Sequence, residues 1–131
     1  MTEPVSHAVW WRSPPLPPEP ESVAAARAFV EDCCEKWGLG EASETAVLIV
    51  SELATNAVKH SRTPVTVWLA RRLDRIVLSV QDGSSVHPQL EPAGELDEQG
   101  RGMVVVDLLA QRWGEREVPE GKLVWAEIAT R

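Results

Sequence analysis

The sequence predicts an α+β fold, a two-layer α/β sandwich in which helices cover one face of a mixed, mostly antiparallel sheet. Three observations support this: two consecutive amphipathic helical segments in the first half, segments rich in alternating β-branched residues joined by short polar turns, and one more helix before a final hairpin. Helices and strands in this order pack as two layers. The 131 residues fit a single domain that spans the whole chain.

The composition is that of an ordinary globular protein, with 44% hydrophobic and 25% charged residues. The net charge of −7 repels phosphate backbones and anionic lipids, so we expect neither a nucleic-acid nor a membrane partner. No apolar run is long enough to span a bilayer, and the N-terminus lacks a signal-peptide pattern. We therefore expect a cytoplasmic protein. Cys33 and Cys34 are adjacent in a helical pattern and are expected to be reduced thiols, one of them in the core.

The first 20 residues predict a short strand followed by a proline-rich connector. The strand covers residues 6–12, and Trp10 and Trp11 then point to opposite faces, one towards the core. The segment SPPLPPEPES removes backbone donors and favours extended geometry, so it is neither helix nor central strand. A first helix is predicted from Ser22, as its N-cap, to Gly38 or Gly40.

The rest of the chain predicts further elements in clear order. A second helix runs from near Ser43 through His60, and residues 63–71 and 75–81 form a hairpin. Residues 83–99 have no periodicity and form a long loop. A third helix is expected over about residues 102–113, followed by a hairpin that turns at residues 119–121.

Four polar residues gather on one side of the second helix: Glu52, Asn56, Lys59 and His60. The helical period places them opposite an apolar arc. One interpretation is a surface helix that shows its polar side to solvent. The other is a site, because an amide oxygen ligates hard cations such as Mg²⁺ and a carboxylate accepts a proton from a hydroxyl. Asparagine favours the second interpretation mildly, since it is a poor residue for a helix interior.

Two other segments supply groups that suit the remaining parts of a nucleotide. The strand RIVLSVQD ends in Asp82, whose carboxylate beside Gly83 can accept a hydrogen bond from an adenine amino group. After the long loop, Gly100 and Gly102 stand at the expected start of the third helix, where backbone N–H groups and the helix dipole favour phosphate. A simple turn and helix cap explains these glycines equally well.

The segments ELATNAVKH, VQDGSS, GRGMVVVDLLA and GKLVWAEI, in this order, resemble the adenine-nucleotide domain of the GHKL superfamily, which has the Bergerat fold and includes gyrase, heat-shock chaperones, histidine kinases and MutL. The likeness covers the chain from about residue 20 to the end. It is strongest to stand-alone anti-sigma-factor serine/threonine kinases and related actinobacterial ATP-binding regulatory proteins. The E-x-x-x-N helix is its most specific part.

The resemblance implies ATP and Mg²⁺ as cofactors and a role for each matching residue. Glu52 is implied as the catalytic base, Asn56 as the Mg²⁺ ligand and Asp82, with Gly83, as the adenine-reading group. Residues 83–99 correspond to the ATP lid. The implied contacts with the phosphates or the lid come from the following residues: Lys59, His60, Gly100, Arg101, Gly102 and Met103.

Two departures from the family pattern bear on activity. The usual D-x-G-x-G motif is replaced, since Asp82 and Gly83 are followed by Ser84, Ser85 and Val86. Glu98 and Gln99 stand where sporulation-type kinases carry an arginine, so Arg101 is left as the cation for the terminal phosphate.

The resemblance therefore implies a serine/threonine protein kinase that transfers the γ-phosphate of ATP to a protein partner, such as a sigma-factor antagonist. The alternative is a weak or inactive nucleotide-binding module that regulates a sigma factor or its antagonist by contact. A third possible function, ATP hydrolysis coupled to conformational work, needs a transducer domain, and we expect none in this sequence. ATP or ADP and a protein are the implied partners, and a homodimer is compatible with the resemblance.

Overall fold

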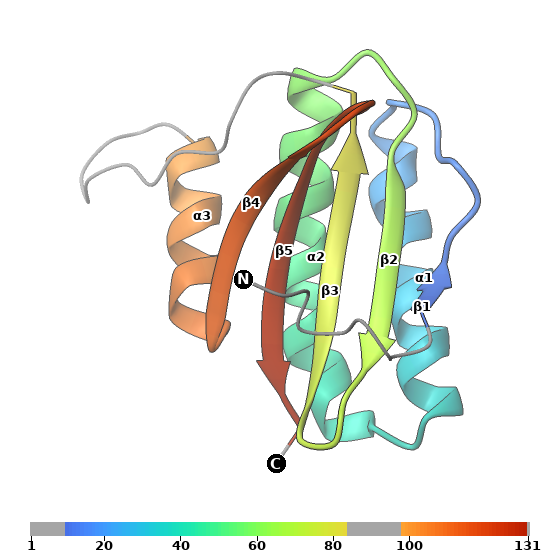
Figure 1. Ribbon diagram of the computed structural model, residues 1–131, viewed down its shortest axis with the longest axis vertical. Coiled ribbons are helices and arrows are strands. Elements are labelled where there is room, and N and C mark those ends of the chain that lie inside the picture. Colours follow the sequence, from blue (N-terminus) through green and yellow to red (C-terminus); the bar gives the residue numbers. More distant parts are fainter. Residues whose placement is uncertain (1–9, 84–97, 131) are drawn as a thin grey trace.

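The protein folds as one open five-stranded sheet with three helices on one face (Figure 1). The computed structural model describes residues 10–83 and 98–130, with the backbone alone described for residues 98–102. The strand order is β1-β2-β3-β5-β4, and every described pair is antiparallel. The elements are β1 (Trp10–Arg12), α1 (Glu21–Lys36), α2 (Gly40–His60), β2 (Thr66–Arg71), β3 (Arg75–Asp82), α3 (Glu98–Leu109), β4 (Arg112–Val118) and β5 (Gly121–Ala129).

This architecture confirms the predicted α+β sandwich. The two predicted hairpins are present, as β2–β3 and β4–β5. Only the mixed character of the sheet was wrong, because all pairings among the described strands are antiparallel. The crossover through α3 returns the chain so that β5, and not β4, pairs with β3.

Helix α1 begins at Glu21, and the prediction that Ser22 caps it was wrong. The N-cap is Pro20, which has no side chain able to cap the helix. Ser22 instead lies inside the first turn, buried, and its hydroxyl donates to the carbonyl oxygen of Pro17 at 2.6 Å. The proline connector is thereby fixed to the helix. The helix ends as predicted, because Gly38 adopts a positive φ of 70° that suits glycine.

Helix α2 begins at Gly40, three residues earlier than predicted. The carbonyl oxygen of Leu39 accepts backbone hydrogen bonds from Ala42 and Ser43, so the first turn forms before Ser43. The helix then runs to His60 as expected. Five of its buried residues lie on the predicted apolar arc: Ala46, Val50, Leu53, Ala54 and Ala57. Ala42 and Ile49 are buried as well, although the helical period places them on the side of Asn56 and His60, so the buried face of α2 is wider than predicted.

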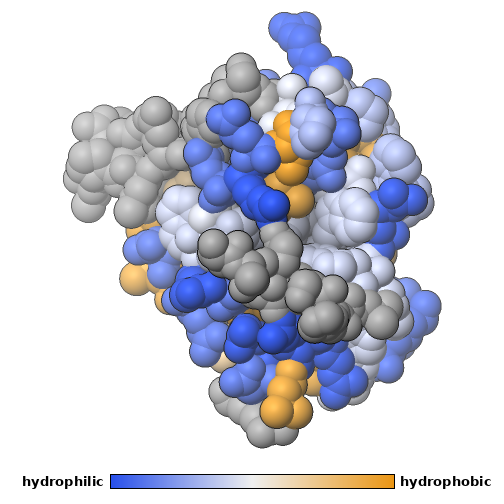
Figure 2. All heavy atoms as spheres, in the orientation of Figure 1, coloured by the Kyte–Doolittle hydropathy of each residue, from blue (hydrophilic) through white to orange (hydrophobic). Residues whose placement is uncertain are grey.

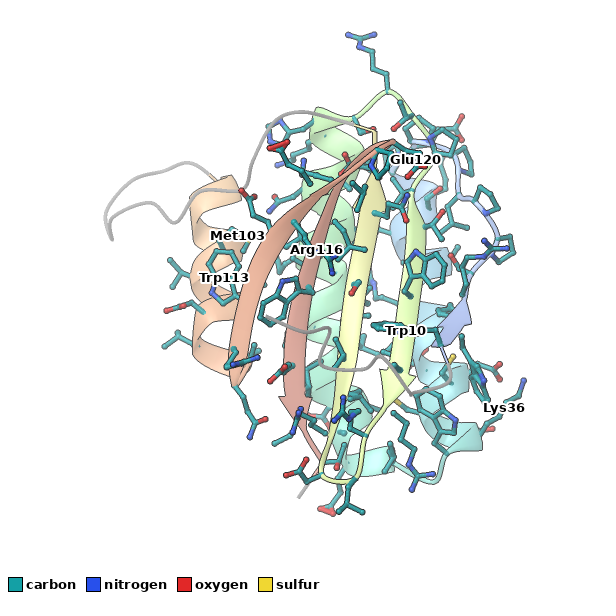
Figure 3. The ribbon with its side chains drawn as sticks, in the orientation of Figure 1. Trp10, Lys36, Met103, Trp113, Arg116 and Glu120 are labelled. Carbon is teal, nitrogen blue, oxygen red and sulfur yellow. The ribbon has the colours of Figure 1, made fainter. Side chains whose placement is uncertain are left out.

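Helix α3 differs most from the prediction, because it covers Glu98–Leu109 and not residues 102–113. The amide of Ala110 still bonds to the carbonyl oxygen of Val106, but that of Gln111 donates to the carbonyl oxygen of Glu127 in β5. Strand pairing therefore replaces the helix before Trp113, which lies in β4 beside α3 (Figure 3). Its indole Nε1 donates to Asp107 of α3 at 2.8 Å.

The two faces of the sheet have different environments. The inner face, which includes Leu69, Leu78 and Ile128, packs under the helices and forms the hydrophobic core. Trp11 packs against that core and stacks on Trp37 at a centroid distance of 4.5 Å. Trp10 lies on the opposite face, so the predicted split of the two tryptophans is confirmed. Described residues on the outer face are mostly hydrophilic, and the hydrophobic ones form small separate groups (Figure 2).

Cys33 and Cys34 are both buried, free thiols of α1, one more core cysteine than predicted. Burial, with Asp32 and Cys34 nearby, raises the pKa of the Cys33 thiol to about 11. Among the described residues, no helix combines the length and the apolar character needed to cross a bilayer.

Candidate functional site

The predicted site residues come from elements that meet at one end of the molecule. Figure 1 shows that the C-terminal ends of α2 and β3 lie at the same end as the first residues of α3 and β5. Glu120, in the turn that leads into β5, also lies there (Figure 3). Helix α2 packs on β3, β5 and α3, and Asn56 and His60 lie in the part of the helix that ends here.

The polar stripe of α2 is only partly open to solvent. Glu52 and Asn56 are half-buried, as is His60, whereas Lys59 is exposed. The first two are four residues apart, about one helical turn, and their side chains therefore lie on the same side. A carboxylate and an amide that are neither free in solvent nor sealed in the core can contact a ligand without paying the cost of full burial. This environment fits the interpretation as a site better than that of a plain surface stripe.

Asp82, the last residue of β3, forms an ion pair with Lys122 of β5. The Lys122 Nζ lies 3.6 Å from the Asp82 Oδ2, and the two residues are only 5% and 3% exposed. They are directly opposite each other in the β3–β5 register. The carboxylate is therefore enclosed in this structure, where the sequence had suggested an accessible group at a strand tip.

Thr63 joins the end of α2 to the end of β3. Its Oγ1 accepts a hydrogen bond from the backbone N–H of Gly83 at 2.7 Å and contacts the hydroxyl of Ser61. Ser61 follows α2 directly, and its N–H donates to the carbonyl oxygen of Ala57 in that helix. This chain of contacts fixes Asp82 and Gly83 relative to the helix that carries Asn56.

Two glycines allow close packing at this end: Gly121 lets the β5 backbone approach the end of β3, and Gly83 leaves room for the Thr63 side chain. A Cβ on Gly121 would lie 2.1 Å from the carbonyl oxygen of Asp82, and this glycine has a φ of 148°. A Cβ on Gly83 would lie 2.7 Å from the Thr63 side chain. A side chain at either position therefore requires a shift of the segment that holds Asp82.

A comparison of the sequence with models of known protein families identifies the family to which the chain belongs. The model of the histidine kinase-like ATPase domain matches residues 16–128, which include α1 to β4 and all but the last residue of β5. The chain belongs to this family. No curated protein matches the sequence. As a histidine kinase-like ATPase domain, the protein is expected to bind ATP.

The start of α3 in this ATPase domain differs from the prediction for the phosphate contacts. Because the helix begins at Glu98, Gly100 and Arg101 fall in its first turn, and Gly102 is the fifth helical residue. The first four N–H groups of a helix lack partners inside it, so Gly100 keeps the predicted environment for phosphate and Gly102 lies beyond it. Met103 is fully buried in the core, so packing accounts for its position. The predicted lid, apart from its end residues, lies outside the described residues.

No cluster of three or more His, Cys, Asp or Glu side chains with metal-binding geometry occurs in the described part of this ATPase domain. Mg²⁺ with a nucleotide commonly has one or two protein ligands and the phosphates as the others. The half-buried Asn56 amide has the chemistry for that single protein ligand.

Sequence reasoning missed Lys122 and Thr63. The signal for the lysine was present, because Lys122 has the same strand parity as Val124, Ala126 and Ile128, which face the core. A charged residue on an inward-facing position needs a buried partner. Thr63 had no such signal, since its contact with Gly83 depends on how the end of α2 folds towards β3.

Proposed function

We propose that the protein is an ATP-dependent regulatory protein kinase that transfers the γ-phosphate of ATP to a serine or threonine of a protein partner, with Mg²⁺ as cofactor. The observation that supports this most is the half-buried E-x-x-x-N pair, Glu52 and Asn56, on the flank of α2 in a chain of the histidine kinase-like ATPase family. A sigma factor or its antagonist is the proposed partner class, and a homodimer the proposed assembly.

In the proposed reaction the partner's hydroxyl oxygen forms a bond to the γ-phosphorus while the bond to the β–γ bridging oxygen breaks. Glu52 accepts the hydroxyl proton, and ADP leaves with Mg²⁺. Asn56 ligates the Mg²⁺ through its amide oxygen, and Arg101 neutralises charge on the transferred group. Lys59, His60 and Gly100 are proposed to contact the phosphates, and Asp82 with Gly83 the adenine.

Two substitutions test the division between chemistry and binding. Glu52→Ala is expected to keep ATP affinity and to lose about 10² to 10⁴ in transfer rate, because a general base contributes to the chemical step. Asp82→Ala is expected to lose ATP binding. Affinity is measured by isothermal titration with Mg·ATP, and transfer by incubation of γ-labelled ATP with a lysate of the source organism. Wild-type affinity and labelling in both variants would show that the site is wrong.

The second candidate is a module that regulates its partner by contact, without phosphoryl transfer. The enclosed Asp82–Lys122 pair favours it, because a base must gain access to a carboxylate that is 3% exposed. The replaced D-x-G-x-G motif agrees with it. Titration with Mg·ATP and Mg·ADP separates the two candidates: heat with either nucleotide, followed by partner labelling that Glu52→Ala abolishes, supports the kinase. No heat with either supports the module.

A further inference from the structure

Lys122 is a buried lysine at the site end of β5, and the proposed reaction gives it no role. Lys122 is 5% exposed, and its Nζ lies 3.6 Å from the Asp82 Oδ2. Leaving a buried carboxylate without a cation is costly, and the same holds for a buried ammonium group without an anion. Each of the two side chains is therefore required for the burial of the other.

The backbone fixes the position of this lysine. Asp82 and Lys122 are directly opposed in the antiparallel register of β3 and β5. Next to Lys122, Gly121 lets the β5 backbone pass within contact of the Asp82 carbonyl group. Thr63 holds the other side of the same segment through the N–H of Gly83. The ammonium group thus approaches the carboxylate from a position that the sheet determines.

A separation of 3.6 Å is longer than a direct N–H···O hydrogen bond of about 2.7–3.2 Å, so the contact is an ion pair and not a short hydrogen bond. The amino group of a purine is neutral. It can donate a hydrogen bond to Asp82, but it cannot replace the positive charge of Lys122. The pair must therefore persist when a base is bound.

We propose that Lys122 is a positioning residue for base recognition: it holds the Asp82 carboxylate as an oriented anionic acceptor, and so determines how strongly the site selects a purine with a 6-amino group. This inference rests on the proposed nucleotide site and goes beyond it, because it assigns the selectivity to a pair and not to Asp82 alone. A hydrogen bond to an anionic acceptor is about twice as strong as one to a neutral acceptor.

The test compares ATP with purine riboside triphosphate, which lacks the 6-amino group, by isothermal titration in the presence of Mg²⁺. The wild-type protein is expected to bind ATP about tenfold more tightly or better, which is the typical effect of one hydrogen bond to a charged group. In Lys122→Gln the ratio of the two affinities is expected to fall towards one. In Lys122→Arg, which keeps the charge, the ratio is expected to stay within about threefold of wild type.

The ratio separates a positioning role from a structural one. General damage to the pocket weakens both triphosphates equally and leaves the ratio unchanged. Lys36→Gln is the matched control, because Lys36 is an exposed lysine of α1 whose partner is Asp32 (Figure 3). The ratio of the affinities of Lys36→Gln for ATP and purine riboside triphosphate is expected to equal that of the wild type. If Lys122→Gln does not fold, the double variant Asp82→Asn/Lys122→Gln removes both buried charges and is expected to give the same loss of selectivity.

The outcomes distinguish this inference from the proposed function. Undiminished selectivity in folded Lys122→Gln overturns the role of Lys122 and leaves the nucleotide site intact. Tighter ATP binding by that variant also overturns it, since the lysine then competes with the base. If the wild-type protein binds ATP and purine riboside triphosphate with equal affinity, the Asp82–Lys122 pair does not recognise the 6-amino group, whereas the proposed nucleotide site still stands. A wild-type protein that binds neither refutes the proposed function, and the inference with it.

Discussion

Strands β3 and β5 bury a carboxylate at each end of their pairing, and the two carboxylates are held in different ways. At the site end, Asp82 meets one lysine at 3.6 Å on the helix-covered face. At the far end, Glu127 lies on the outer face, where Arg112 donates two hydrogen bonds to it at 3.2 and 3.0 Å. The Nε of Arg75 lies 3.7 Å from the same carboxylate.

This difference follows from the two cations. A guanidinium group is a planar fork that matches both carboxylate oxygens, so Arg112 and Glu127 fix each other's geometry. An ammonium group is a point charge on a flexible chain and does not match both carboxylate oxygens in this way. The far end is therefore built for stability. At the site end, Gly121 and Thr63 fix the backbone around Asp82, and we propose that its carboxylate, held by Lys122, accepts a hydrogen bond from a ligand.

The largest effect on stability is expected from Glu127→Ala. Removal of this 4% exposed carboxylate takes two charge-assisted hydrogen bonds from Arg112 and leaves Arg75 with Asp74 as its remaining carboxylate partner, so we expect a loss of about 3–5 kcal/mol. Urea denaturation measures the loss, and ATP affinity is expected to stay at the wild-type value. Glu44→Ala, at an exposed position of α2, is the control and is expected to change stability by less than about 0.5 kcal/mol.

If Glu127→Ala loses less than about 1 kcal/mol, the arginine-held end has no special structural role and the comparison fails. If it also loses ATP binding, the two ends are coupled through β3 and β5 and are not separate in function.

The next effect is expected from Gly121→Ala, which acts at the site end. The added Cβ meets the Asp82 carbonyl oxygen and sits at a φ that L-residues rarely adopt, so we expect a loss of about 2–4 kcal/mol. Unlike Glu127→Ala, it is also expected to abolish ATP binding, because the Asp82 segment must move. Urea denaturation and isothermal titration with Mg·ATP measure the two effects.

Gly40→Ala is the control for the glycine substitution, because a Cβ at Gly40 meets nothing within 4 Å. It is expected to keep both stability and ATP affinity. Retained ATP affinity in Gly121→Ala would contradict a site built on the close approach of β3 and β5.

The sequence predicted the elements and the nucleotide groups well where the pattern is local. The β2–β3 hairpin, the course of α2 to His60 and the stop at Gly38 are all properties of neighbouring residues, and the structure confirms them. The carboxylate at the end of β3 is also local. The roles of Glu52, Asn56 and Asp82 in binding and catalysis stay predictions.

Two of the errors, the predicted end of α3 and the predicted accessibility of Asp82, come from contacts between segments distant in the sequence. Helix α3 ends early because Gln111 and Trp113 join β5, and periodicity within residues 102–113 carries no information on that pairing. The burial of Asp82 depends on which residue β5 places opposite it, namely Lys122. That partner is determined by the register of β5, a strand that neighbours β3 in the sheet but is distant from it in the sequence. The ion pair could therefore not be predicted from the β3 sequence.

A smaller effect is expected from Thr63→Val, which keeps the shape of the side chain and removes its hydroxyl. The Gly83 N–H loses its 2.7 Å acceptor, so stability is expected to fall by about 1 kcal/mol. ATP affinity is expected to fall as well, because Asp82 is released from the end of α2. Thr66→Val in β2 is the control, since no side-chain hydrogen bond of Thr66 occurs among the described residues. Equal ATP affinities for both variants would show that Thr63 does not position the site.

The smallest effect is expected from Lys36→Gln, which tests whether burial or distance ranks the ion pairs. Lys36 Nζ lies 3.0 Å from the Asp32 Oδ2, closer than the 3.6 Å of the Lys122–Asp82 pair. The side chains of Lys36 and Asp32 are, however, both more than half exposed. Solvent and salt screen such a pair, so the free energy of unfolding is expected to match the wild type within error. Lys122→Gln is expected to destabilise the protein, because it removes the cation that lies 3.6 Å from the buried Asp82 carboxylate. Urea denaturation of both variants at low and high salt decides the order. A greater loss for Lys36→Gln would mean that contact distance governs these pairs, and the contrast between the two ends of the sheet would then lose its physical basis.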